Sequence, residues 1–393
     1  MPAEPFIYLD NHATTRLDPL VLEAMLPWLT EHYGNAGSGT HALGLEAREA
    51  VETARQQVAT AIAATPREVV FTSGATESIN LALVGAASRR PGGRLVVVAT
   101  EHAAVLDTAA HLERQGWPVT RLPVASQAAD CPGLIDCEQL AAAVDEQTVL
   151  VSVMLANNEI GVLQPLADVA AIVHERGALL HVDCAQAIGN GAVDVDAIGA
   201  DLASFSGHKC HGPKGVGALY VRRRERLVRL DPQVFGGGQE RGLRSGTLNV
   251  PGVVGMGRAC ELAVAGLPAV PVAVAALRDR LWQRLVDAVP SLRLNGPALQ
   301  SDLRLPNNLN IQLPQLDGGT LLAELSRHGV AASAGSACSS EHPRPSHVLL
   351  ALGLTDEEAR CSIRLGLSRF STAAEIEQAA DCMAAAVDRL TGR

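Results

Sequence analysis

The stretch Ser204-Phe-Ser-Gly-His-Lys-Cys-His-Gly-Pro-Lys-Gly follows directly on a hydrophobic segment that ends at Ala203. This places the amine of Lys209 at the end of a predicted strand, beside Ser206, His208 and several glycines. A lysine held there loses water, lowers its pKa and can condense with an aldehyde as a Schiff base. Glycine-rich loops that contain a lysine are also common turns, so this stretch alone does not establish a cofactor site.

Around this stretch, short β-branched runs alternate with alanine-rich stretches from about residue 46 to 260. Such alternation is typical of βαβ units with a largely parallel sheet that is buried on both faces. We therefore predict an α/β fold with a central sheet of these strands: Val69-Val-Phe-Thr, Leu95-Val-Val-Val-Ala, Val119-Thr-Arg-Leu-Pro, Val149-Leu-Val-Ser-Val-Met, Ala178-Leu-Leu-His-Val, Leu202-Ala-Ser-Phe and Val216-Gly-Ala-Leu-Tyr-Val.

The pattern changes after Pro251, where an alanine-rich helical run leads to a second, small sheet around Leu309-Asn-Ile-Gln-Leu. We predict two domains from this change. Residues 16–258 form the large domain, and residues 1–15 plus 259–393 form a smaller α+β domain.

Composition narrows the class of protein. A chain of 393 residues with 47% hydrophobic and 19% charged residues can bury a large core. Its formal charge of −10 and its dispersed basic residues argue against a nucleic-acid-binding face. Its apolar runs are too short to span a bilayer and no secretory signal is evident, so we expect a cytoplasmic protein. Its eight cysteines lack Cys-x-x-Cys spacing, so we expect no metal site.

Polar residues follow several of the predicted strands directly. In open α/β sheets, ligands bind beyond the carboxyl ends of the strands, so these residues are expected to converge on one crevice. They are Ser73-Gly-Ala-Thr, Thr100-Glu-His, Asn157-Asn-Glu, Asp183-Cys-Ala-Gln and Ser206-Gly-His-Lys.

Two of these segments suggest the parts of a pyridoxal phosphate site. Ala75 and Thr76 open a predicted helix and would present backbone N–H groups to a phosphate, although an ordinary N-cap explains them equally well. Asp183 facing a pyridine nitrogen would keep that nitrogen protonated, and Gln186 would donate to the phenolic oxygen of the ring. A helix-capping aspartate is the alternative interpretation of Asp183.

A histidine and a cysteine complete the set of candidates. His102 lies at the end of another predicted strand, where it could stack on the ring and act as a general acid and base, although a lone histidine is more often structural. Cys338 lies in Gly335-Ser-Ala-Cys-Ser-Ser, a stretch without helical or strand periodicity, so we expect an exposed thiol on a loop. Beside a Schiff-base lysine, that thiol is best interpreted as a nucleophile.

Taken together, these residues resemble the cysteine desulfurases of the NifS/IscS-like group, in which the nucleophile lies on a long loop. The resemblance covers nearly the whole chain in order and spacing. The motifs that carry it are Tyr8-Leu-Asp-Asn-His-Ala-Thr-Thr, Thr72-Ser-Gly-Ala-Thr-Glu-Ser, Thr100-Glu-His, Asn157-Asn-Glu-Ile-Gly, His181-Val-Asp-Cys-Ala-Gln, Ser206-Gly-His-Lys, Arg241-Gly-Leu-Arg-Ser-Gly-Thr and Gly335-Ser-Ala-Cys.

The resemblance implies an aspartate-aminotransferase type fold (type I of the PLP-dependent transferases), a homodimer and pyridoxal 5′-phosphate as cofactor. Lys209 would bind the cofactor aldehyde, and Thr247 would reach the phosphate in the partner subunit. Arg364 would pair with the substrate carboxylate, helped by Asn158. The remaining cofactor contacts implied by the resemblance are Ala75, Thr76, His102, Asn158, Asp183, Gln186, Ser206 and His208.

The implied reaction converts L-cysteine to L-alanine and leaves sulfur on Cys338 as a persulfide, which then passes to an acceptor protein of unknown identity. Selenocysteine lyase or another C–S lyase on the same fold is the first alternative, and a catalytically silent scaffold is the second. Position 12 is His where many relatives have Asn or Ser, and position 211 is His where Tyr is common, so we expect altered hydrogen bonding near the substrate. Because few residues follow Arg369-Phe-Ser-Thr, we do not expect the docking to an iron–sulfur scaffold that the resemblance implies for housekeeping members with a longer tail.

Overall fold

The structure is built around a central sheet of seven strands. The computed structural model describes residues 6–334 and 345–392. The strand order is β2-β8-β7-β6-β5-β3-β4, and only β8 runs antiparallel to its neighbours. All seven predicted strands are confirmed, with these bounds: β2 (Val69–Thr72), β3 (Arg94–Val98), β4 (Val119–Leu122), β5 (Thr148–Met154), β6 (Leu179–Asp183), β7 (Leu202–Ser206) and β8 (Gly217–Val221).

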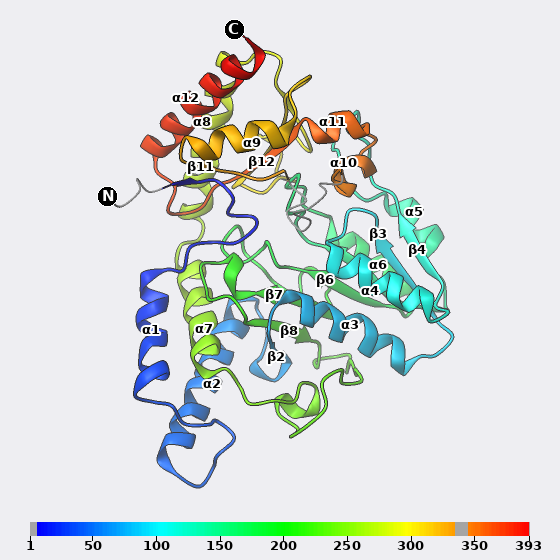
Figure 1. The fold of residues 1–393 in the computed structure, drawn as a ribbon. Helices are drawn as coiled ribbons and strands as arrows, with labels where there is room; N and C mark the ends of the chain where they lie inside the picture. The colour runs from blue at the N-terminus through cyan, green and yellow to red at the C-terminus, as the bar shows by residue number, and fades with distance from the viewer. Residues whose placement is uncertain (1–5, 335–344, 393) are drawn as a thin grey trace.

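Helices cover both faces of this sheet (Figure 1). Successive strand residues alternate between two hydrophobic cores, as the pleat requires: Leu95 and Val97 belong to one, Val96 and Val98 to the other. The first core packs against α3 (Ala75–Arg89) and α4 (Ala103–Arg114). The second packs against α1 (Pro19–Thr30), α2 (Ala42–Ala61), α5 (Cys137–Ala143), α6 (Leu166–Glu175) and α7 (Val250–Ala265).

A smaller antiparallel sheet, β12-β10-β9, lies at the other end of the molecule (Figure 1). It shares a separate hydrophobic core with the chain start, where β1 pairs in parallel with β11. Besides the central sheet and the helices that cover it, the remaining α-helices and strands are β1 (Ile7–Tyr8), α8 (Ala269–Ala288), β9 (Arg293–Leu294), β10 (Asn308–Gln312), α9 (Gly318–Arg327), β11 (Val330–Ala331), α10 (His347–Ala351), α11 (Asp356–Arg360), β12 (Ser362–Gly366) and α12 (Ala373–Thr391).

The alanine-rich run after Pro251 is two helices rather than one, because Pro268 stands between α7 and α8 and a proline cannot continue a helix. The two helices are bent by 77°. We propose that the separate cores mark the two domains, although the boundary predicted at residues 258 and 259 falls inside α7.

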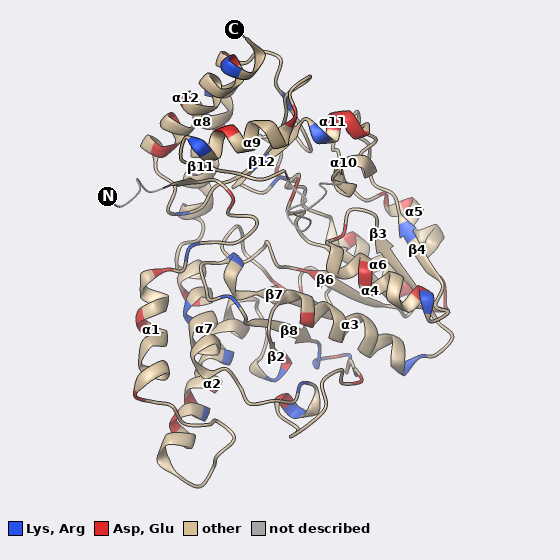
Figure 2. Ribbon diagram, in the orientation of Figure 1, with Lys and Arg blue, Asp and Glu red and all other residues tan. Residues whose placement is uncertain are grey.

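Charged residues of both signs are interspersed over the whole molecule (Figure 2). Among the described residues, no single helix is both long and apolar enough to cross a membrane, and α7 with α8 meets that requirement only as a bent pair, by length and composition. In the same part of the chain, no cluster of His, Cys, Asp or Glu side chains is arranged to hold a metal ion.

Candidate active site

A cavity of about 680 Å³ lies where the carboxyl ends of β5, β6 and β7 meet the chain start and β12. It brings together ten of the twelve predicted site residues. Thr247 is exposed and does not line this cavity, and Cys338 lies outside the described residues. The ten that line the cavity are Ala75, Thr76, His102, Asn158, Asp183, Gln186, Ser206, His208, Lys209 and Arg364.

Lys209 ends a short 3₁₀ turn, Gly207–Lys209, directly after β7. Its amine donates hydrogen bonds to the carbonyl oxygens of His12 and of Ala13, the latter at 2.9 Å. The chain contains two lysines, Lys209 and Lys214, and both line this cavity. The site therefore holds every primary side-chain amine of the protein.

Asp183 is the last residue of β6 and is buried. Its Oδ1 accepts a hydrogen bond from the Ala185 N–H at 2.9 Å. Burial raises the pKa of this carboxyl group, and the nearby His102 and Lys209 lower it. A cationic ring nitrogen in the cavity would favour the ionised form further.

The N-terminus of α3 opens into the cavity. Its N-cap is Gly74, which has no side chain to cap the helix, and Glu77 accepts from the Ser73 N–H at 2.7 Å. The side-chain N-cap given above as the alternative is therefore not observed. The first N–H groups at Ala75 and Thr76 keep the positive end of the helix, a favourable place for a phosphate.

His102 is the N-cap of α4, and its Nδ1 accepts a hydrogen bond from the Ala104 N–H at 3.1 Å. Nδ1 therefore acts as an acceptor, which leaves Nε2 as the ring nitrogen able to donate to a ligand. Burial and the charges of Lys209 and Lys214 lower the pKa of His208 to about 4, so this second imidazole is neutral at pH 7. Its Nδ1 lies 3.1 Å from Thr14 Oγ1.

Gln186 is held by His12. The Gln186 amide nitrogen donates to the His12 carbonyl oxygen at 3.0 Å, and its Oε1 lies 3.1 Å from His12 Nδ1. An amide nitrogen has two protons, so one remains for a ligand. Burial and the charge of Arg364 lower the pKa of His12 to about 3, and the ring is therefore neutral.

Arg364 on β12 lines the cavity with a side chain only 1% exposed. Its Nη1 donates to the Asn158 carbonyl oxygen and its Nη2 to Asp10 Oδ1, both at 3.0 Å. These contacts fix the plane of the guanidinium group, which suits bidentate binding of a carboxylate.

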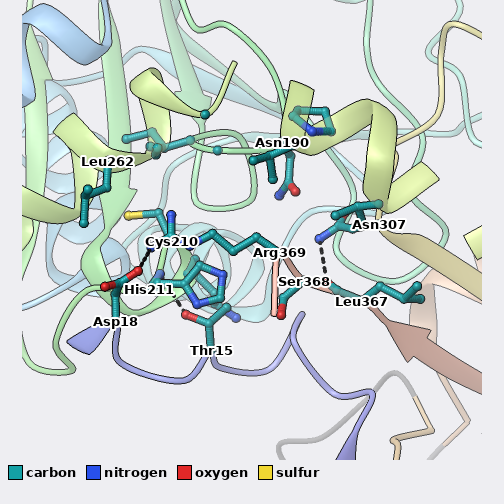
Figure 3. Close-up of a pocket in the computed structure, with 18 residues that line it drawn as sticks. Thr15, Asp18, Asn190, Cys210, His211, Leu262, Asn307, Leu367, Ser368 and Arg369 are labelled. Carbon is teal, nitrogen blue, oxygen red and sulfur yellow. Dashed lines mark hydrogen bonds and ion pairs between the residues drawn. The ribbon is translucent and has the colours of Figure 1, made fainter. Parts of the chain in front are cut away.

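A second cavity, of about 240 Å³, is also lined by Lys209, together with Cys210, His211 and Arg369. The last three are labelled in Figure 3. His211 lines this second cavity and not the large one, so its effect on hydrogen bonding near the substrate stays a prediction. Its backbone φ is +67°, and its Nδ1 lies 2.9 Å from the Arg16 carbonyl oxygen.

Three further residues line the large cavity without having been predicted as site residues: Lys214, Glu159 and His347. Lys214 could have been found from the sequence, because it lies in the same glycine-rich stretch as Lys209. No sequence pattern distinguishes Glu159 and His347 from ordinary loop residues. Ser346 donates to Glu159, and His347 Nε2 lies 2.9 Å from the Glu101 carbonyl oxygen.

Comparison with known proteins places this site in a family. The family model described as aminotransferase class-V matches residues 7–379. The chain is 50% identical over 375 residues to the cysteine desulfurase IscS of Anaeromyxobacter dehalogenans (strain 2CP-C), covering 95% of this chain and 90% of that relative. A solved structure described as a NifS-like protein superposes with a TM-score of 0.89 at 39% identity, covering 98% of this chain and 100% of the other.

A second solved structure, of SspA in complex with cysteine, has a TM-score of 0.79 at 34% identity and covers 93% of this chain and 99% of its own. These matches confirm the fold predicted from the sequence, that of PLP-dependent transferases of the aspartate aminotransferase type. The chain belongs to the class-V aminotransferase family and, within it, to the NifS/IscS-like cysteine desulfurases.

Proposed function

We propose that this protein is a pyridoxal-phosphate-dependent cysteine desulfurase, which converts L-cysteine to L-alanine and passes the sulfur through Cys338 to an acceptor protein. One observation carries the assignment of the site: Lys209 and Asp183, from the ends of neighbouring strands, line the same cavity. An amine that binds an aldehyde and a carboxylate that pairs with a ring nitrogen must both reach one molecule.

The residues present fit the cofactor. The uncapped start of α3, with Ser206 and His208 beside it, suits a phosphate. At the other end, Asp183 would hold the pyridine nitrogen and Gln186, with Asn158, the phenolic oxygen side. When bound, pyridoxal 5′-phosphate supplies an aldehyde and an aromatic ring that takes up electrons released at the α-carbon of an amino acid.

Each remaining group of the site handles the substrate. Arg364 binds the substrate carboxylate and so orients the α-carbon. The Lys209 amine, which lines the same cavity, would take the α-proton of the amino acid. His102 donates and accepts a proton from its Nε2.

Cys338 performs the sulfur transfer. Its thiolate attacks the sulfur atom of L-cysteine, an S–S bond forms and the C–S bond breaks. The carbon that loses sulfur takes a proton, and alanine leaves. The reaction is balanced, since one cysteine and one thiol become one alanine and one persulfide, whose outer sulfur then passes to an acceptor.

Other features remain predictions. We place Thr247 on the phosphate of a partner subunit, which would explain why it lies exposed and away from its own cavity. This assignment requires the homodimer that the family resemblance implies. The cytoplasmic location likewise remains a prediction from the sequence.

The direct test is mass spectrometry of the protein after incubation with L-cysteine. The peptide that contains Cys338 should gain one sulfur atom, and alanine should appear in step. Cys338→Ala should keep the bound cofactor yet form no persulfide, while Cys137→Ala, a partly buried cysteine on α5, serves as the matched control. Undiminished sulfur release by Cys338→Ala would instead indicate a C–S lyase.

A further inference from the structure

Four polar side chains form a buried row across the central sheet: Glu101, which follows β3, Ser152 on β5, His181 on β6 and Ser204 on β7. All four are completely buried. Ser152 Oγ lies 3.4 Å from Glu101 Oε2 and 2.8 Å from His181 Nδ1, and His181 Nε2 lies 2.9 Å from Ser204 Oγ. None of these described side chains lines the large cavity, so the reaction above does not use them.

The buried row lies beside Asp183. His181 precedes Asp183 by two residues on β6, so both side chains point to the same face of the sheet. Ser204 is the register partner of Asp183 on β7. Glu101 Oε1 accepts a hydrogen bond at 2.6 Å from the N–H of Met154, which is the register partner of Asp183 on β5.

Two buried carboxyl groups therefore interact, and in such a pair one is held protonated because two negative charges cannot both be stabilised. Asp183 lines the cavity, and although its burial raises its pKa, the nearby His102 and Lys209 partly offset that rise. Glu101 makes no ion pair within the described residues. Burial and the charge of Asp183 raise the pKa of Glu101 to about 8.

The hydrogen-bond directions follow from the proton on Glu101. Burial lowers the pKa of His181 to about 3, so its ring is neutral and has one N–H. If Glu101 is protonated and donates to Ser152, then Ser152 donates to His181 Nδ1, and His181 Nε2–H donates to Ser204. Loss of the Glu101 proton reverses every one of these bonds and moves the imidazole proton to Nδ1.

We propose that the buried row keeps a proton on Glu101. The single negative charge shared by the carboxyl groups of Glu101 and Asp183 then resides on Asp183, which faces the ring nitrogen of the cofactor. The inference rests on the proposed function, because that function gives Asp183 its partner. Glu101, Ser152, His181 and Ser204 are positioning residues, because they act on the site only through Asp183. The titratable groups that face Glu101 are Asp183 and His181 from β6, with His102 next in the chain and His347 from α10.

Glu101→Gln tests the proposal, because glutamine copies the protonated acid: it accepts from Met154 and donates to Ser152 at every pH. The loaded wild-type protein should show a change in its visible absorption spectrum as the pH rises through about 8. Glu101→Gln should have the wild-type spectrum at pH 7 and lack this change. A spectrum already altered at pH 7, or a transition that persists in the variant, would overturn the proposal.

A second measurement needs no turnover and no bound cofactor. In wild-type protein without cofactor, ¹⁵N NMR of labelled histidines should show the His181 proton on Nε2 at pH 7 and on Nδ1 above the Glu101 transition. His181→Gln identifies the signal. Finding the proton on Nδ1 at pH 7 contradicts the proposal. Because this result does not depend on cysteine or Cys338, it separates failure of the buried row from failure of the proposed function.

Discussion

Arg364 Nη2 lies 3.0 Å from Asp10 Oδ1, although 354 residues separate the two in the chain. The Arg364 side chain is almost completely buried and that of Asp10 is 19% exposed. The ion pair holds the guanidinium group at the edge of the large cavity, and it ties the chain start to β12, where Asp10 also bridges to Gly366.

Arg364→Lys should raise KM for L-cysteine and lower kcat/KM about 10- to 100-fold, because lysine keeps the charge but loses one of two charge-assisted hydrogen bonds to the carboxylate. Steady-state kinetics measure this effect. Arg293→Lys, on exposed β9 of the same small sheet, is the matched control and should behave as wild type. Equal KM values for wild type and Arg364→Lys would remove Arg364 from substrate binding.

The two lysines allow an unambiguous test of cofactor attachment. Borohydride reduction of the loaded protein should fix the cofactor covalently to Lys209, and peptide mass spectrometry should locate it there. Lys209→Ala should lose both the label and the visible absorption band. In Lys214→Ala the label should stay on Lys209. A label on Lys214 in the wild type would show that the wrong lysine has been assigned.

The lowered pKa of His12 predicts that the protein loses stability in acid. Its pKa is about 3 in the folded protein and 6.5 when unfolded, so between these values the unfolded state binds the extra proton. The free energy of unfolding must then fall as the pH drops below 6.5, by up to about 1.4 kcal/mol per pH unit for this group. His12→Asn should flatten that dependence. Denaturant titrations at pH 7 and pH 5 measure it, and an unchanged slope would contradict the prediction.

Glu240 precedes Thr247 in the segment between β8 and α7 and forms a buried ion pair with Arg55. Arg55 Nη1 and Nη2 bind both carboxylate oxygens of Glu240, each at 2.7 Å, and Glu240 also accepts from the Phe71 N–H at 2.8 Å. Glu240→Ala should cost about 3–5 kcal/mol of stability, because it leaves the Arg55 charge buried and unpaired. We also expect weaker cofactor binding.

Glu146→Ala is the control for Glu240→Ala. Its partner is Arg176, and this pair is exposed, with side chains 81% and 44% accessible. The loss should be below about 1 kcal/mol, because water screens exposed pairs. Equal costs in the two variants, measured by chemical denaturation, would show that burial of the Arg55 pair does not matter.

Local patterns were sufficient for much of this fold. β-branched runs predicted each of the seven central strands, since a strand buried on both faces has to be apolar along its length. The polar residues after those strands included Lys209, Asp183 and His102, because the carboxyl ends of neighbouring parallel strands meet at one edge.

By itself, the sequence determined which segments form strands and which residues end them, because these depend on neighbours in the chain. Only the tertiary structure decided contacts between distant segments: Lys209 against Ala13, Arg364 against Asp10, and Gln186 against His12. It also placed His211 on the smaller cavity and connected Glu101 to His181 through Ser152. Such contacts follow from the closure of long loops and from side-chain packing, which no local pattern encodes.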